Sequence, residues 1–135
     1  MVRLGLVVAQ FDKSGTVIGE MERHAREQAR ERDAEVVATV EVPGSYDTPL
    51  AADRLARRDD IDAVAVLGAV VTGDTDHDQV IADAAARGLT DVSLDRDTPV
   101  TLGIIGPGMS RAEAEARVTY GARAVDSAVD LVEEL

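Results

Sequence analysis

The chain has 135 residues, and its 26 acidic and 14 basic side chains give a net charge of −12. This length fits one domain, 1–135, with a sizeable core. A surface so acidic repels nucleic acid and anionic membranes, so we expect neither as a partner. The absence of cysteine excludes disulfides and thiolate metal sites. No apolar run approaches the ~20 residues of a membrane span, and the start lacks a secretory signal pattern, so we expect a cytoplasmic protein.

The basic residues are 13 arginines and a single lysine, Lys13, while acidic residues crowd segments such as 53–62. Hydrophobic residues still make up 45% of the chain and recur with regular periods, which argues against disorder. We therefore expect a folded protein from a high-salt cytoplasm. Concentrated salt would screen the self-repulsion that this charge causes in dilute buffer.

Four apolar, β-branched runs alternate with helical patterns along the sequence. In chain order, the patterns predict strands over 3–10, 35–42, 61–71 and 99–105, and helices over 14–33, 46–58, 75–88 and 110–134. Ser14 is the expected cap of the first helix. Strands that alternate with helices through short connections indicate a three-layer α/β/α sandwich of the flavodoxin-like class, with a four-stranded parallel sheet and right-handed crossovers.

The loops that follow the predicted strands carry the groups of interest, because such sheets bind ligands beyond the carboxyl ends of their strands. Phe11 is the only phenylalanine, and its ring could stack on a flat heterocycle or simply anchor its loop. Pro43 and Gly44 form a tight exit that leaves Ser45 and Asp47 at the next helix start. Capping explains either of these two residues without a ligand.

The most informative stretch is 68–80, GAVVTGDTDHDQV, in which an apolar strand runs through Gly73 into a helix. Thr75 is the candidate N-cap, and the free N–H groups of Gly73, Asp74 and Thr75 would suit a phosphate. His77 lies in the first helical turn and is one of two histidines in the chain. It is therefore the best candidate for moving protons near neutral pH.

Simpler interpretations of these residues stay open. A capped helix after a strand is common in doubly wound proteins, so the motif alone indicates a structural role as readily as a binding one. Asp74, Asp76 and Asp78 alternate as in a calcium loop, but the required glycine and closing glutamate are missing, which disfavours a metal site. Arg117 lies among acids, where arginines ordinarily form surface ion pairs.

Four segments, taken together in order, resemble lumazine synthase, most closely its archaeal forms. They are AQFD (9–12), VPGSYDTPLA (42–51), LGAVVTGDTDHDQV (67–80) and PVTLGIIGPGMSRAEAEAR (99–117). The resemblance implies a transferase of riboflavin biosynthesis. It would condense 5-amino-6-(D-ribitylamino)uracil with 3,4-dihydroxy-2-butanone 4-phosphate and need no redox or metal cofactor. One alternative is archaeal riboflavin synthase, which lacks the GDTxH motif at the start of this helix. Another is a non-catalytic phosphate-binding or shell-forming protein of the same fold.

The resemblance also implies roles for single residues toward the aminouracil. Phe11 would stack on the pyrimidine, and Ser45 and Asp47 would meet the ribityl hydroxyls. The backbone around Val70 and Val71 would read the edge of the pyrimidine ring.

For the second substrate, the resemblance implies that Gly73, Asp74 and Thr75 bind the phosphate. Arg117 would reach it from a neighbouring subunit, and His77 would shuttle protons. A site shared between subunits makes a homopentamer the expected minimal unit, and assemblies in this family extend to hollow sixty-subunit shells.

Several residues depart from the family pattern. Asp47 stands where many members have glutamate, and Leu102, expected in the pocket wall, stands where phenylalanine is common. Arg123 is expected to take the place of a lysine. Acids at 74, 76 and 78 are unfavourable beside a bound phosphate unless their side chains turn outward.

Overall fold

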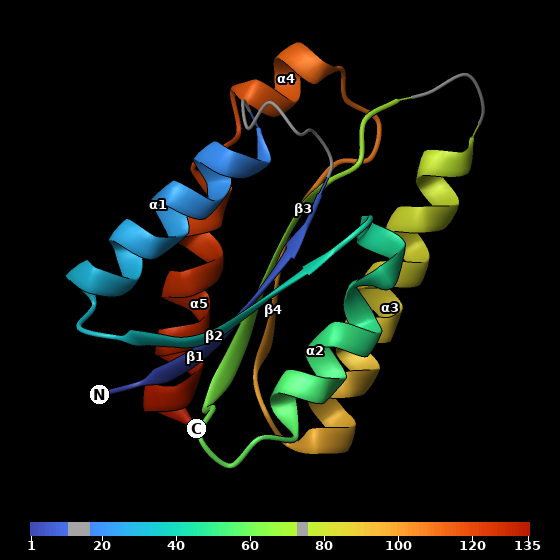
Figure 1. The fold of residues 1–135 in the computed structure, drawn as a ribbon. Coiled ribbons are helices and arrows are strands. Elements are labelled where there is room, and N and C mark those ends of the chain that lie inside the picture. Colours follow the sequence, from blue (N-terminus) through green and yellow to red (C-terminus); the bar gives the residue numbers. More distant parts are fainter. Residues whose placement is uncertain (11–16, 73–75) are drawn as a thin grey trace.

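The computed structural model describes residues 1–10, 17–72 and 76–135. Its strands form one parallel sheet in the order β2-β1-β3-β4: β1 (Arg3–Ala9), β2 (Glu35–Val42), β3 (Ala63–Ala69) and β4 (Val100–Ile105). Helices α1 (Ile18–Glu31) and α5 (Tyr120–Glu134) cover one face, and α2 (Thr48–Ala56) and α3 (His77–Arg96) cover the other (Figure 1). The predicted three-layer α/β/α sandwich with a four-stranded parallel sheet is confirmed.

Alternating side chains of the two central strands build a separate core on each face of the sheet. On β1, Leu6 and Val8 pack with residues of α1 and α5, while Val7 packs with residues of α2 and α3. On β3, Leu67 and Val66 are divided between the two cores in the same way. Because both faces of these strands are covered, they are apolar at nearly every position.

The strand order reverses beside β1. Val7 pairs with Val40 of β2 on one side and with Val66 of β3 on the other. The chain therefore moves outward from β1 in both directions, which makes the carboxyl ends of β1 and β3 the switch point of the sheet. Open α/β sheets bind their ligands in the crevice at such a point.

Helix α3 extends eight residues beyond the predicted end at Gly88 and reaches Arg96. Gly88 does not stop the helix, because its missing side chain serves packing: a Cβ there would lie 2.8 Å from Pro49 Cγ of α2. The helix ends where Asp97 adopts a left-handed conformation with φ 50°. No helix in the described ranges, α3 included, combines the length and the apolar composition that a membrane-spanning helix needs.

The helix predicted over 110–134 is two helices, α4 (Arg111–Glu115) and α5. Ser110 starts α4, accepting the Glu113 N–H at 3.2 Å through its hydroxyl. The chain then turns through 116–119, where Val118 and Thr119 are weak helix formers. Gly121 lets α5 approach α1 closely, since a Cβ there would lie 2.2 Å from the Met21 carbonyl oxygen.

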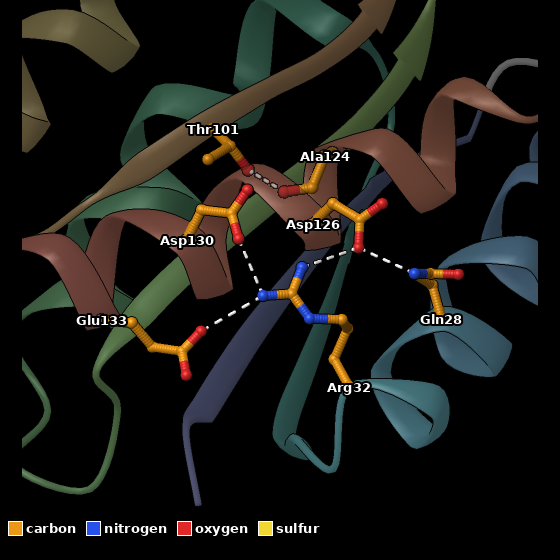
Figure 2. A network of polar contacts seen from close by, with 7 residues as sticks. All are labelled: Gln28, Arg32, Thr101, Ala124, Asp126, Asp130 and Glu133. Carbon is orange, nitrogen blue, oxygen red and sulfur yellow. Dashed lines mark hydrogen bonds and ion pairs between the residues drawn. The ribbon is translucent and has the colours of Figure 1, made fainter.

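Polar contacts hold α5 from two sides (Figure 2). From β4, Thr101 Oγ1 donates a hydrogen bond to the Ala124 carbonyl at 2.8 Å. From the end of α1, the Arg32 guanidinium contacts three carboxylates of α5: Asp126 at 3.0 Å, Asp130 at 2.7 Å and Glu133 at 3.2 Å. One arginine therefore neutralises part of a dense acidic group between two helices.

Candidate active site

Two chain exits meet beyond the carboxyl ends of β1 and β2. Gln10, the residue after β1, donates its N–H to the Val42 carbonyl at 2.8 Å, so the two strands leave the sheet side by side. After Pro43 and Gly44 the chain enters a short 3₁₀ helix, η1 (Ser45–Asp47), which packs against α3. Phe11, predicted to stack on the pyrimidine, lies outside the described residues.

Ser45 lies over the switch point of the sheet. A Cβ added to Gly68 of β3 would come within 2.7 Å of Ser45 Oγ and 3.3 Å of the Ala9 Cβ, so this hydroxyl lies where β1 and β3 end. Ser45 is only 6% exposed, and its Oγ finds no hydrogen-bond partner in the part of the chain that the structure describes. A buried polar group without a partner costs about 1–3 kcal/mol. A polar ligand group that reached Ser45 would remove this cost.

Asp47 makes a local bond with its own loop. Its Oδ2 accepts the Gly44 N–H at 3.0 Å, and the residue is exposed. Asp47 occupies the N-cap position of α2, but its side chain makes no capping bond to that helix. The loop-stabilising interpretation of Asp47 is thus supported, and a contact with the ribityl chain stays a prediction.

The segment after β3 continues beside the loop that follows β4. The N–H of Val70 donates to the Ile105 carbonyl at 2.9 Å, and the N–H of Thr72 donates to the Met109 carbonyl at 2.8 Å. Successive N–H groups point to opposite sides of an extended chain, so the N–H of Val71 points away from the loop that follows β4. Among the described residues the N–H of Val71 has no backbone partner, whereas that of Val70 is already bonded. The contact of either group with the pyrimidine edge stays a prediction.

His77 is the first residue of α3, and Asp76 is its N-cap residue. Both are exposed, whereas Asp78 is 9% exposed and accepts the Gly108 N–H at 3.4 Å through Oδ2. Asp78 therefore does not turn outward and does not meet the condition for an acid to be tolerated beside a bound phosphate. The predicted phosphate-binding residues Gly73, Asp74 and Thr75 lie outside the described residues.

Arg117 lies in the turn between α4 and α5, on the loop side of the sheet. Its Nη1 donates to the Glu113 carbonyl at 3.2 Å and approaches Met109 Sδ at 3.7 Å. The Glu113 carboxylate is 3.8 Å away, a long and partly exposed ion pair of little energetic value. The pKa of Glu113 is held below its usual value chiefly by the Ser110 N–H, with the Arg117 charge as a smaller cause.

Leu102 lies away from the strand ends, in the middle of the edge strand β4, and is 55% exposed. It lines a surface depression of about 360 Å³ together with Tyr120, Arg123 and Leu131 of α5. The Arg123 guanidinium lies 4.5 Å from the centre of the Tyr120 ring. Within one chain, Leu102 and Arg123 thus belong to this edge, and their contact with substrate stays a prediction.

Sequence reasoning did not identify the inward position of Asp78. A signal was present, because Asp78 falls on the buried stripe of α3 with Ala85, Leu89 and Val92, at spacings of seven, four and three residues. The contact between Ser45 and Gly68 had no comparable signal, since it joins residues of separate strand ends.

Comparison with known proteins identifies the family of this chain. The family described as 6,7-dimethyl-8-ribityllumazine synthase matches residues 1–135. A protein of that name from Halobacterium salinarum is 68% identical over the full length of both chains. One from Halorubrum lacusprofundi is 65% identical, covering 100% of this chain and 99% of the relative, and one from Methanococcus aeolicus is 49% identical, covering 100% and 98%. The chain belongs to the 6,7-dimethyl-8-ribityllumazine synthase family.

Proposed function

We propose that the carboxyl end of this sheet is the active site of a lumazine synthase of riboflavin biosynthesis. Here 5-amino-6-(D-ribitylamino)uracil and 3,4-dihydroxy-2-butanone 4-phosphate would condense to 6,7-dimethyl-8-ribityllumazine, phosphate and water. The observation that carries the proposal is the buried Ser45 hydroxyl, which has no partner among the described residues, next to the helix that begins with His77. Membership of the family indicates which reaction is catalysed, and the Ser45 hydroxyl indicates where a polyol chain would bind.

The aminouracil would lie over the ends of β1 and β3. Its ribityl hydroxyls can both donate to and accept from Ser45 Oγ, so the pairing satisfies a group that the fold leaves unpaired. The backbone of Val71 would then face the pyrimidine edge, and Phe11 would stack on the ring. Asp47, whose Oδ2 is bonded to Gly44, would contribute through its second carboxylate oxygen.

The phosphorylated ketone would bind with its phosphate at Gly73, Asp74 and Thr75, directly before α3. The amino end of a 20-residue helix favours an anion there. Arg117 would complete the phosphate site from a neighbouring subunit. The contacts of its guanidinium with described residues involve Nη1, which leaves other N–H groups for a charge-assisted, bidentate contact.

The reaction needs protons moved more than it needs a nucleophile from the protein. The amine of one substrate attacks the C2 ketone of the other, and water leaves as the imine forms. Loss of a proton from C3 then expels phosphate from C4, and the resulting enol becomes a ketone at C3. The ribitylamino nitrogen attacks this ketone, and a second water leaves as the ring closes. His77 would carry protons between these groups, a contribution of about 10²- to 10⁴-fold. Holding two substrates in one orientation lowers the barrier by up to about 7–11 kcal/mol, so orientation should outweigh His77.

The proposed minimal unit is a cytoplasmic homopentamer that works in high salt and can assemble further into an icosahedral shell. The exposed edge of β4 supports association, because Leu102 is 55%, Tyr120 39% and Leu131 38% exposed beside it. An edge strand with apolar side chains is ordinarily covered in the working protein. A second chain over this edge would also bring its own residues toward the substrates.

The test is to incubate the protein with both substrates in molar salt and to follow lumazine fluorescence and free phosphate together. A mixture without protein measures the uncatalysed reaction. The proposal expects both products to form in equal amounts and far faster than in that mixture. Binding of the phosphorylated ketone without product would instead indicate a non-catalytic phosphate-binding protein, and riboflavin formed from the lumazine alone would indicate a riboflavin synthase.

A further inference from the structure

The side chain of Asp78 joins the first turn of α3 to a distant loop. Asp78 is 9% exposed, although it directly follows the exposed His77. Its Oδ2 accepts the N–H of Gly108, at 3.4 Å, from the segment between β4 and α4. A carboxylate in the first turn of a helix is also favoured by the helix dipole.

The loop that contains Gly108 has close contacts with two other parts of the site. Gly106, with φ +98°, lies so near β3 that a Cβ there would be 2.1 Å from the Val70 carbonyl oxygen. The Met109 carbonyl accepts the Thr72 N–H at 2.8 Å, and the Met109 sulfur lies 3.7 Å from Arg117 Nη1. Through Gly108, the turn that carries His77 is thus connected to the end of β3 and to the segment that carries Arg117.

We propose that Asp78 is a positioning residue, which acts on the reaction by holding His77 in place relative to this loop. The inference rests on the proposed function and adds a residue to it. His77 is exposed at a helix end, where side chains and backbone fray unless a neighbour fixes the turn. The inward carboxylate of Asp78 supplies that fixed point.

Kinetics of matched variants test the inference. Because misplacing a reacting group by about 1 Å can cost 10²-fold, Asp78→Ala is expected to lower kcat by about 10- to 100-fold. KM for the aminouracil should change by less than about threefold, since uniform substrate binding is not lost. Asp78→Asn keeps an oxygen that accepts the Gly108 N–H and should restore kcat to within about fivefold of the native value. Asp91→Ala removes an exposed acid from the same helix and should match the native protein.

A double variant separates positioning from general stability. If Asp78 acts through His77, adding Asp78→Ala to His77→Ala should change kcat by less than about threefold. If the two substitutions together lower kcat by the product of their separate effects, the inference is overturned. A native kcat in Asp78→Ala would also overturn it. Should Asp78→Ala fail to fold, Asp78→Glu keeps the charge but displaces the carboxylate, and the same loss of kcat is expected from it.

Amide hydrogen exchange provides a readout that does not depend on activity. In Asp78→Ala the Gly108 amide should exchange at least about tenfold faster than in the native protein, and Asp78→Asn should restore its protection. If the native protein makes no lumazine but the Gly108 amide responds in this way, the proposed function fails and the bond between the two elements stands. An unchanged Gly108 amide overturns the positioning role whatever the activity.

Discussion

Ser45 and Gly68 are fitted to each other across the central strand. The Ser45 Oγ occupies the place beside Gly68 where a side chain would begin, 2.7 Å from the position of a Cβ. A residue that follows β2 thereby reaches β3 over the end of β1. This contact explains why Ser45 is buried. It also explains why β3 has a glycine at position 68, where a larger side chain would collide with Ser45.

Opposite effects on stability are expected for Ser45→Ala and Gly68→Ala. Ser45→Ala removes a buried hydroxyl that has no partner among the described residues, so the free energy of unfolding should stay equal or rise by about 1 kcal/mol. Gly68→Ala forces a Cβ against Ser45 Oγ and should lower the free energy of unfolding by about 1–3 kcal/mol. Chemical denaturation measures both. KM for the aminouracil should rise in both variants, and a stability loss in Ser45→Ala would show that the hydroxyl already has a partner.

His77→Ala should lower turnover by roughly 10- to 1000-fold and leave both KM values nearly unchanged. The loss stays limited because the amine and the ketone already react slowly unaided once they are held together. Steady-state kinetics with each substrate varied in turn measures both effects. His24→Ala, which changes the other histidine, located on α1, is the control. An unchanged turnover in His77→Ala would leave the protons to water or substrate groups.

Arg117→Ala should raise KM for the phosphorylated ketone by about 10- to 100-fold, because a charge-assisted bond to phosphate contributes about 1.5–3 kcal/mol. KM for the aminouracil should change little. Arg111→Ala removes a nearby exposed arginine of α4 and serves as the control. Mixing Arg117→Ala subunits with subunits altered at Phe11 should restore part of the activity if sites are shared. Equal rises in both KM values would indicate a loss of assembly instead.

The layers and the ends of the strands can be predicted from the sequence more accurately than the loops. The apolar, β-branched runs predicted all four strands, because a strand covered on both faces of a parallel sheet is apolar at nearly every position. Gly88 gave the wrong end for α3, since its small size serves packing against Pro49 rather than termination. The burial of Ser45 depends on contacts between separate strand ends, which no local pattern encodes. The inward turn of Asp78 had a signal in the spacing of the buried residues of α3, but its partner Gly108 lies in a distant loop that the spacing does not identify.

Arg32→Ala tests how far salt compensates for the acidic surface. Arg32 faces Asp126, Asp130 and Glu133, so its loss leaves three carboxylates to repel one another at the end of α5 (Figure 2). The melting temperature should fall in dilute buffer and by less than half as much in molar salt, which screens the repulsion. Arg30→Ala, an exposed change of equal charge on α1, should have a smaller effect. An equal loss in both salts would point to lost packing.

Asp62, which lies at the end of the sheet remote from the site, should make the stability of the fold sensitive to acid. Hydrogen bonds from the Arg3 side chain are the main cause that lowers the pKa of Asp62. A carboxyl whose pKa is lower in the folded state stabilises the fold above its unfolded pKa of about 3.9, and this stability is lost as pH falls through the folded value. Asp62→Asn should therefore cost about 1 kcal/mol at pH 7 and little at pH 2, measured by denaturation. A cost independent of pH would contradict the ion-pair explanation.

A crystal structure of the protein with the aminouracil bound tests the central claim most directly. The account predicts that the pyrimidine lies over the carboxyl ends of β1 and β3, with a ribityl hydroxyl within hydrogen-bond distance of Ser45 Oγ and the ring edge at the backbone of Val71. An aminouracil bound elsewhere, with Ser45 Oγ still unpaired, would contradict the account.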